Sequence, residues 1–275
     1  MKSKTLVSVV TTVYNGEEYV DRSVDSIMSQ DYPDFEWVIV DDGSTDNTVS
    51  KLNERVGADH QVRVYQPGRL GRSNALNFAV DKARGEYIAN HDFDDISLPN
   101  RLSLQAEVLE LHNDVGVIGG NHIAVDDIRG ERYVRRQPVS HDEVVRAMAK
   151  YIPFAHTIAM FRKRTWEDAG GYPEAENAID MRLWCDVLKT RWKFRGVPEV
   201  LGKHFIYKNS FWNENFGYLY KQYDLAKLNA RAITLGGLPR WMYIYPASRI
   251  IYTGLPTKLK RLVRRNISKL NEKDI

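Results

Sequence analysis

The chain has 275 residues, of which 43% are hydrophobic and 27% charged, as is ordinary for a soluble protein of one large domain with an appendage or two small domains. With a single cysteine, Cys185, the chain can form neither an intrachain disulfide framework nor a thiolate metal site, which favours a reducing compartment. Cys185 is predicted to be a buried structural residue. The net charge is +3, but no Asp or Glu occurs from Ala226 to Asn271, where Lys and Arg recur.

The first 95 residues alternate between apolar strands and amphipathic helices. Strands are predicted at 6–12, 35–40, 62–65 and 86–90, with helices at 20–28 and 75–83 among the intervening segments. Such alternation favours an α/β fold, with a mostly parallel, Rossmann-like sheet flanked by helices.

The remaining chain is predicted to extend this sheet and then to become helical. The expected helices are 99–112, 180–189 and 218–232, and the expected strands are 115–118, 133–137 (an edge strand), 157–161 and one or two within 192–206. We therefore expect a catalytic domain at 1–214, divided into a nucleotide-binding half (1–95) and an acceptor-binding half (96–214). A basic amphipathic helical region follows at 215–275.

Polar and acidic residues follow the predicted parallel strands, and ligands of such sheets bind beyond the carboxyl ends of the strands. They occur at 12–15, 41–42, 68–72 and 92–95. Carboxylates as close as Asp92, Asp94 and Asp95 repel one another, and hard oxygen ligands suit Mg²⁺ or Mn²⁺. The alternative is an acidic turn that caps the helix after Pro99.

Three stretches in this order resemble glycosyltransferase family 2: Val7 to Asn15, Trp37 to Asp46, and Gly85 to Ile88 leading to Asp92-Phe93-Asp94-Asp95. The resemblance covers roughly residues 5 to 210 and implies the A-type glycosyltransferase fold. It also implies an inverting enzyme that uses a nucleotide-diphosphate sugar and a divalent metal.

The resemblance places the nucleotide sugar against the first half of the chain. Thr12, Tyr14 and Asn15 would contact the base and ribose together with Asp42, although Asp41 could exchange roles with Asp42. A carboxylate can accept the imide N–H of uracil, and a tyrosine ring can stack on the base. Arg72, with Asn77, matches the segment near the diphosphate; the alternative for Arg72 is a solvated loop cation.

The Asp-any-Asp motif at 92–94 matches the metal site of the family. Asp94 would ligate the metal directly, Asp92 would contact the ribose, the metal or a metal-bound water, and Asp95 would support the turn. A metal bound there would neutralise the diphosphate and improve it as a leaving group.

A general base is expected at Asp180, which matches the Asp of a Glu-Asp pair in the family, although Ile179 replaces the Glu. The alternative for Asp180 is a helix N-cap. His156 and Arg182 are candidate acceptor or phosphate contacts, and His156 could instead be a hydrogen-bonded, partly buried histidine. Tyr207 occupies the usual place of a late histidine, so a metal or phosphate role for His204 has little support.

The C-terminal region combines aromatic residues at 241–245, apolar residues at helical spacing from 259 to 270, and interleaved Lys and Arg. This pattern suits an anionic membrane surface, so we expect a peripheral protein at the cytoplasmic face of the cell membrane. The alternative is a helical hairpin that packs on the catalytic domain or forms a dimer. Nucleic acid is not expected as a partner, because no recognised binding motif occurs.

The preferred hypothesis is transfer of a sugar, from a donor that is most often UDP-linked in the family, to a saccharide or lipid-linked saccharide in cell-surface glycan assembly. The alternative is a binding or scaffold protein with the same fold but no turnover, which the loss of the Glu at 179 would favour. A nucleotidyltransferase or a dinucleotide-binding dehydrogenase would need a glycine-rich loop after the first strand, and Tyr14-Asn15-Gly16 is not one.

Overall fold

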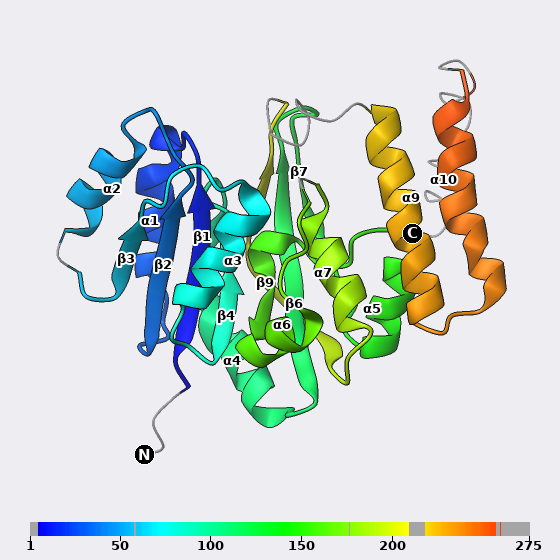
Figure 1. Cartoon of the computed structure of the whole chain (residues 1–275), viewed down its shortest axis with the longest axis horizontal. Coiled ribbons are helices and arrows are strands. Elements are labelled where there is room, and N and C mark those ends of the chain that lie inside the picture. Colours follow the sequence, from blue (N-terminus) through cyan, green and yellow to red (C-terminus); the bar gives the residue numbers. More distant parts are fainter. Residues whose placement is uncertain (1–4, 58, 176, 209–217, 257–258, 260–275) are drawn as a thin grey trace.

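The computed structural model describes residues 5–57, 59–175, 177–208, 218–256 and 259. One twisted sheet of nine strands extends from residue 7 to residue 206, with helices on both faces, as the sequence predicts (Figure 1). The strand order is β3-β2-β1-β4-β8-β6-β9-β5, and β7 pairs with β6 outside this path. The predicted halves at 1–95 and 96–214 therefore share a single sheet.

The first half forms the parallel block of the sheet. Its strands are β1 (Val7–Val13), β2 (Phe35–Asp41), β3 (Val62–Tyr65) and β4 (Tyr87–Asn90), and its helices are α1 (Val20–Met28), α2 (Thr48–Val56) and α3 (Arg72–Lys82), with the short 3-10 helix η1 (Glu17–Tyr19). Val7 pairs with Phe35 on one side and Tyr87 on the other, so the carboxyl ends of these strands meet at one edge. Every residue of β2 is buried, as expected for a central strand covered on both faces.

The second half adds antiparallel pairs and a long parallel pair. Its strands are β5 (Ile96–Ser97), β6 (Val115–Asp126), β7 (Glu131–Arg135), β8 (Met160–Arg162) and β9 (Lys193–Ile206), and its helices are α4 (Arg101–Leu111), α5 (His141–Met148), η2 (His156–Ile158), α6 (Lys163–Ala169) and α7 (Ile179–Val187). Strand β8 pairs antiparallel with β4 and β6, whereas β6 and β9 run parallel.

Several predicted boundaries in this half are wrong. The strand predicted at 115–118 continues to Asp126, and the polar segment after it contains α5, whose Ser140–Glu143 capping box the prediction overlooked. The strand predicted at 157–161 begins only at Met160, because residues 156–158 form the 3-10 turn η2. Segments that pair across the sheet gain ladder hydrogen bonds, so tertiary pairing overrides weak local propensity.

Two apolar clusters hold the helices to the sheet. One packs α3 and α7 on one face, with Trp184 fully buried, and the other packs α1 and α4 on the opposite face, with Trp37 fully buried. Cys185 lies in the first cluster and its Sγ lies 3.7 Å from the carbonyl oxygen of Leu228, which confirms its structural role.

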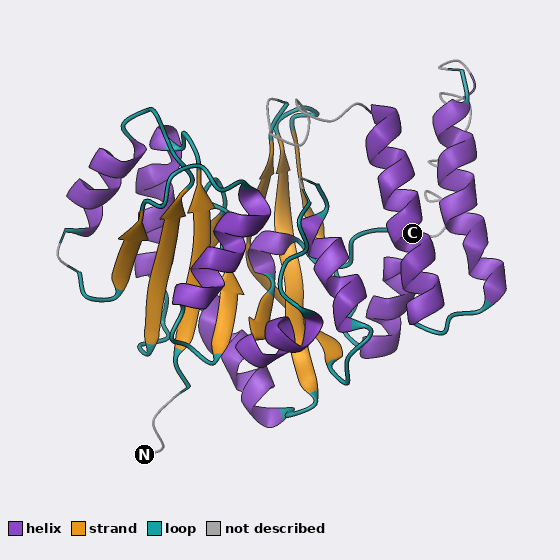
Figure 2. Ribbon diagram, in the orientation of Figure 1, coloured by secondary structure: helices purple, strands orange, loops and turns teal. Residues whose placement is uncertain are grey.

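The C-terminal region forms a helical hairpin, α9 (Tyr218–Leu235) and α10 (Ile244–Gly254), joined by the 3-10 helix η3 (Arg240–Tyr243). Helix α9 packs on α5 and α7, and α10 packs on α9 at the edge of the molecule (Figures 1 and 2). Apart from Leu259, the segment predicted to be helical at 259–270 lies outside the described residues, with all of its basic residues. In the described part of the chain, no helix has the length and apolar character needed to span a bilayer.

Candidate active site

A cleft of about 300 Å³ lies beyond the carboxyl ends of β1 and β4. It collects six of the residues that the sequence predicts for the donor and the metal, namely Thr12, Tyr14, Asn15, Arg72, Asp92 and Asp94. Tyr207, from the end of β9, closes one side. The structure therefore brings segments 12–15, 72 and 92–94 together as the parallel topology requires.

Asn15 and Tyr14 shape the turn after β1. Asn15 adopts a positive φ of 50°, and its Oδ1 accepts a hydrogen bond from the Thr45 N–H at 2.8 Å, so its side chain fixes the neighbouring turn after β2. Tyr14 is 49% exposed, and the guanidinium of Arg69 lies 3.8 Å from its ring centroid. One ring face is thus covered by a cation, which preorganises the tyrosine at the cleft.

Asp41 and Asp42 are both buried and do not line the cleft. Asp41 accepts a hydrogen bond from the Ser44 N–H at 3.2 Å, which closes the turn after β2. Oδ1 of Asp42 accepts N–H bonds from Leu70 and Gly71 at 2.6 and 3.1 Å, and its Oδ2 lies 3.1 Å from Arg69. Both carboxylates therefore hold the loops beside the cleft, and a contact of either one with the base stays a prediction.

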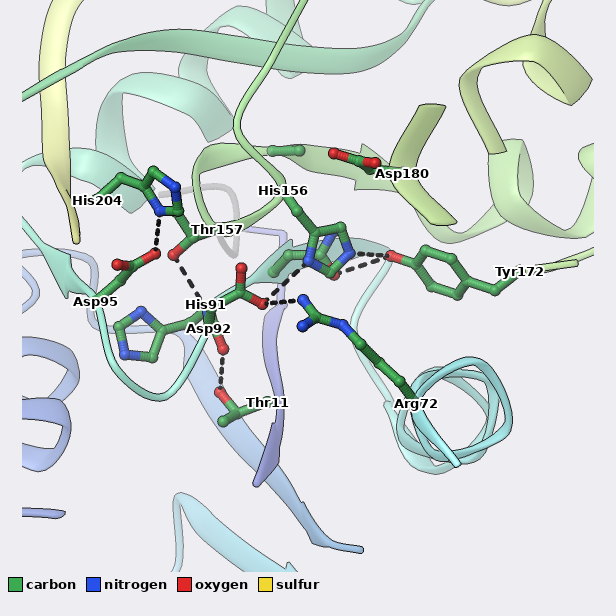
Figure 3. Close-up of polar contacts among 12 residues, drawn as sticks. Thr11, Arg72, His91, Asp92, Asp95, His156, Thr157, Tyr172, Asp180 and His204 are labelled. Carbon is green, nitrogen blue, oxygen red and sulfur yellow. Dashed lines mark hydrogen bonds and ion pairs between the residues drawn. The ribbon is translucent and has the colours of Figure 1, made fainter. Parts of the chain in front are cut away.

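Arg72, Asp92 and His156 form a connected network (Figure 3), of which Arg72 and Asp92 line the cleft. Oδ1 of Asp92 lies 2.9 Å from Arg72 Nη2 and 3.2 Å from His156 Nδ1. Nε2 of His156 lies 3.1 Å from the Tyr172 hydroxyl, which donates to Asn90 Oδ1 at 3.1 Å. The network links α3, β4, η2 and the turn before α7, so Arg72 is an ordered part of the site.

Electrostatic interactions keep both Asp92 and Arg72 charged. Burial opposes ionisation of Asp92, but Arg72 and His156 outweigh that effect and hold the Asp92 pKa well below its ordinary value. Burial likewise opposes the charge on Arg72, while Asp92, Asp94 and Asp180 together raise its pKa. Arg72 is therefore a permanent cation within electrostatic reach of three carboxylates.

Asp94 has the opposite environment. Burial and the like charges of Asp95 and Asp92 raise its pKa to about 7, and no described basic side chain forms an ion pair with its carboxylate. Among the described residues, no three His, Cys, Asp or Glu side chains converge as they would in a metal site built entirely from protein ligands. A single unpaired carboxylate beside an open cleft fits Mg²⁺ or Mn²⁺ that also takes oxygens from a diphosphate.

Asp95 is structural, as expected, and fully buried. Its Oδ1 accepts the Phe205 N–H at 2.8 Å, and its Oδ2 lies 2.9 Å from His204 Nδ1, which ties the acidic loop to β9. Burial disfavours protonation of His204, but Asp95, with Asp92 and Asp94, raises its pKa to about 9. His204 therefore contributes positive charge behind the acidic loop (Figure 3).

Asp180 is the second residue of α7 and lies on the other side of His156 from the metal motif (Figure 3). The N-cap position is Ala178, with a positive φ of 44° and no side-chain cap, so the N-cap alternative for Asp180 is wrong. Oδ1 of Asp180 lies 2.7 Å from its neighbour's amide, Met181 N. Burial is the main cause of its raised pKa, which makes it a stronger base than an exposed carboxylate.

Two predicted contact residues already have other partners. Oδ1 of Asn77 accepts the Tyr172 N–H at 2.8 Å and its Nδ2 donates to the Tyr172 carbonyl at 2.9 Å, so Asn77 positions this tyrosine instead of lining the cleft. Arg182 contacts Asp224 on α9 and the Asn177 carbonyl. Both long-range bonds depend on the folded chain and leave no local sequence signal.

Sequence reasoning overlooked Arg69 and Tyr172. The only signals for Arg69 are the two glycines that flank its loop, Gly68 and Gly71, both at positive φ. Tyr172 follows a glycine pair, Gly170 and Gly171, which marks a turn but gives no indication of its contact with His156. A buried arginine, Arg101, was overlooked as well; it lies behind the acidic loop and donates to the Asn90 carbonyl at 2.7 Å.

Comparisons with known proteins agree with this geometry. The family model described as Glycosyl transferase family 2 matches residues 8–170. The chain is 31% identical over 266 residues to EpsE of Bacillus subtilis (strain 168), covering 93% of this chain and 92% of that protein. It is also 31% identical over 233 residues to the O-antigen biosynthesis glycosyltransferase WbnJ of Escherichia coli, covering 82% and 88%.

Solved structures share the fold. Staphylococcus aureus TarS in complex with UDP-GlcNAc superposes with a TM-score of 0.64 at 18% identity, covering 91% of this chain and 72% of TarS. The mannosyltransferase PcManGT of Pyrobaculum calidifontis, in complex with GDP-Man and Mn²⁺, gives a TM-score of 0.64 at 20% identity, covering 97% and 81%.

Proposed function

This chain belongs to glycosyltransferase family 2, and from that premise we propose that it transfers a sugar from a nucleotide-diphosphate donor with inversion at the anomeric carbon. One observation carries this proposal: Asp180, with its raised pKa, lies across His156 from Asp92 and within electrostatic reach of Arg72, and Arg72 and Asp92 line the cleft. A base and a diphosphate-binding cation on opposite sides of a donor are what an in-line displacement needs.

In the proposed step, the oxygen of the acceptor hydroxyl forms a bond to the anomeric carbon of the donor sugar. Asp180 accepts the proton that this hydroxyl loses. The bond between that carbon and the diphosphate oxygen breaks, and its electron pair leaves with the nucleoside diphosphate. Arg72 is placed to balance the negative charge on this leaving group, because its guanidinium can contact two phosphate oxygens. Its pairing with Asp92 holds it in place before the donor binds.

Asp94, with Asp92 beside it, would hold the divalent metal. A bound Mg²⁺ or Mn²⁺ supplies neutralisation of the diphosphate charge. The raised pKa of Asp94 supports this role, because a cation relieves the repulsion between its carboxylate and the neighbouring acids. The Mn²⁺ in the complex of PcManGT supports the same choice of metal.

Tyr14, Thr12 and Asn15 are proposed to hold the base and ribose, with Arg69 and Asp42 shaping that end of the cleft. We take UDP-sugars as the first donors to test, since TarS is described in complex with UDP-GlcNAc. The acceptor is proposed to be a saccharide or lipid-linked saccharide of a cell-surface polysaccharide, met at the cytoplasmic face of the membrane. The name of WbnJ, an O-antigen biosynthesis enzyme, supports this class.

A donor panel tests the proposal directly. UDP- and GDP-sugars are incubated with the full chain and Mn²⁺ or Mg²⁺, nucleotide release is measured, and the anomeric configuration of any product is read by NMR. Metal-dependent release from one donor and an inverted product are expected. A product with retained configuration would contradict the role of Asp180 as base, and absence of release from every donor would contradict the donor class.

A further inference from the structure

A second, larger groove of about 760 Å³ lies at the junction between α5 and the turn that joins α9 to η3. Its walls are α5, the turn at 188–193 that enters β9, and the segment 235–242. Figure 1 places this junction at the end of the α9–α10 hairpin, away from the carboxyl ends of β1 and β4. No step of the proposed transfer reaction uses it.

Four basic side chains line the groove, Arg146, Lys150, Arg191 and Lys193, together with one acidic side chain, Asp142; Lys193 pairs with Asp114 outside the groove lining. Arg146 and Arg191 are exposed, and neither forms an ion pair with any described residue; the Arg191 guanidinium lies 4.8 Å from the Trp192 ring centroid. Lys150 lies 4.7 Å from the ring centroid of Tyr245. Aromatic faces contact Lys150 and Arg191, and no described carboxylate forms an ion pair with Arg146, Lys150 or Arg191, so these charges are available to an anionic ligand.

An apolar surface continues from the groove along α10. Trp241 at the groove rim is 65% exposed, and Ile244 and Ile251 are 62% and 67% exposed. Ile244 and Ile251 are seven residues apart, so they project from the same side of the helix. Large apolar side chains gathered in this way on a surface mark a contact with another phase or partner.

We propose that this groove and the outer side of α10 form the membrane-contacting surface, with the phosphate of an acidic lipid bound between Arg146 and Arg191. This inference rests on the peripheral membrane association in the proposed function and gives it a site. Cations to bind headgroup phosphate, an exposed indole and an aliphatic helix face are the combination that interfacial helices use. A membrane that contacts this edge of the molecule would lie parallel to α10. The active-site cleft would then open parallel to the membrane surface and would not face the bilayer.

Vesicle co-sedimentation of the full chain tests the site. Vesicles of phosphatidylcholine alone are compared with vesicles that also contain phosphatidylglycerol, for the wild type and for the double variant Arg146→Glu, Arg191→Glu. The matched control is Arg132→Glu, Arg136→Glu, which makes the same charge change on exposed arginines in and just after β7. Thermal unfolding confirms that all variants are folded, and binding of UDP with Mn²⁺ confirms that the cleft is intact.

We expect the wild type to bind the acidic vesicles only, and the groove variant to bind them at least about ten-fold more weakly, since each basic residue near an anionic surface contributes on the order of a factor of five. Trp241→Ser should also weaken binding, and the control should bind like the wild type. Equal loss in both double variants would overturn the site. So would vesicle binding of the groove variant equal to that of the wild type, because the two arginines would then make no contact with the lipid phosphate.

The two proposals can fail separately. If the groove variant loses vesicle binding while no donor is turned over, the reaction is wrong and the membrane site stands. If transfer to a soluble acceptor proceeds while the groove variant binds vesicles as the wild type does, the membrane site is wrong and the reaction stands.

Discussion

Arg182 and Asp224 tie the helix that carries the proposed base to the C-terminal hairpin. Nη2 of Arg182 lies 2.8 and 2.7 Å from the two carboxylate oxygens of Asp224, and its Nε donates to the Asn177 carbonyl at 3.1 Å. Asn177 and Arg182 lie on either side of Asp180 in the chain. Helix α9 therefore supports, from outside, the turn that positions Asp180.

Asp224→Ala should lower both stability and turnover. It leaves Arg182, whose side chain is only 22% exposed, without its partner, so we expect the free energy of unfolding to fall by about 1–3 kcal/mol in urea titrations. The kcat should fall while the donor KM changes little, because the donor half is untouched. If Arg182→Ala, Asp224→Ala shows no coupling between the two changes, the pair does not stabilise the site.

Asp180→Asn should abolish transfer and keep donor binding. The amide cannot accept the acceptor proton, so a loss of about 10²- to 10⁴-fold in kcat is expected. Isothermal titration with UDP and Mn²⁺ should give affinity close to that of the wild type. Near wild-type turnover of the variant would remove Asp180 from the reaction.

The pH dependence should report the same residue. A base works only when deprotonated, so transfer should fall as the pH falls through the Asp180 pKa. Burial raises that pKa, so the acidic limb of kcat/KM should lie above pH 3.8, the usual value for an aspartate. The residual activity of Asp180→Asn should lack this limb; a limb unchanged in that variant would assign it to another group.

Asp94→Asn should remove metal dependence. Wild-type UDP affinity should rise on adding Mn²⁺ and return to its metal-free value with a chelator, whereas the variant should show little response to Mn²⁺. Mutation of a residue that only supports a metal ligand typically weakens metal binding by roughly 10- to 100-fold. Loss of Asp94, a direct ligand in this proposal, should weaken it by more than that. Asn is close in size to Asp, and an unchanged response to Mn²⁺ would place the metal elsewhere.

Arg101→Met should destabilise the whole fold. Arg101 is fully buried, donates to Asn90 and Ala159 carbonyls at 2.7 and 3.2 Å, and forms no ion pair with a described residue. Methionine fills similar space but removes the hydrogen bonds from Arg101 to the Asn90 carbonyl and to the side chains of Ser97 and Gln105, so a loss of about 3 kcal/mol or more in the free energy of unfolding is expected. Arg101→Lys keeps the charge but has fewer hydrogen-bond donors, so its free energy of unfolding should lie between those of the wild type and Arg101→Met. Equal stability of all three proteins would contradict the role given to Arg101.

The sequence predicts the parallel block well because its signals are local. Strands β1 and β2 are runs of β-branched and apolar residues that end at polar turns, and their parallel pairing forces those turns to one edge. The second half is less predictable, since the length of β6 and the turn at His156 depend on partners distant in the chain. Register across strands is a tertiary property and has little local signature.

The family, the fold class and six of the twelve residues that line the cleft can be predicted from the amino-acid sequence, because strand ends carry their chemistry in consecutive positions. The partners of those residues depend on contacts that form in the folded chain. The tertiary structure turned Asp41, Asp42, Asn77 and Arg182 toward loops, a tyrosine and a neighbouring helix, and it paired Asp92 with Arg72 while leaving Asp94 without an ion-pair partner among the described residues. Burial and partner choice set the charge of each group, and both depend on residues far away in sequence.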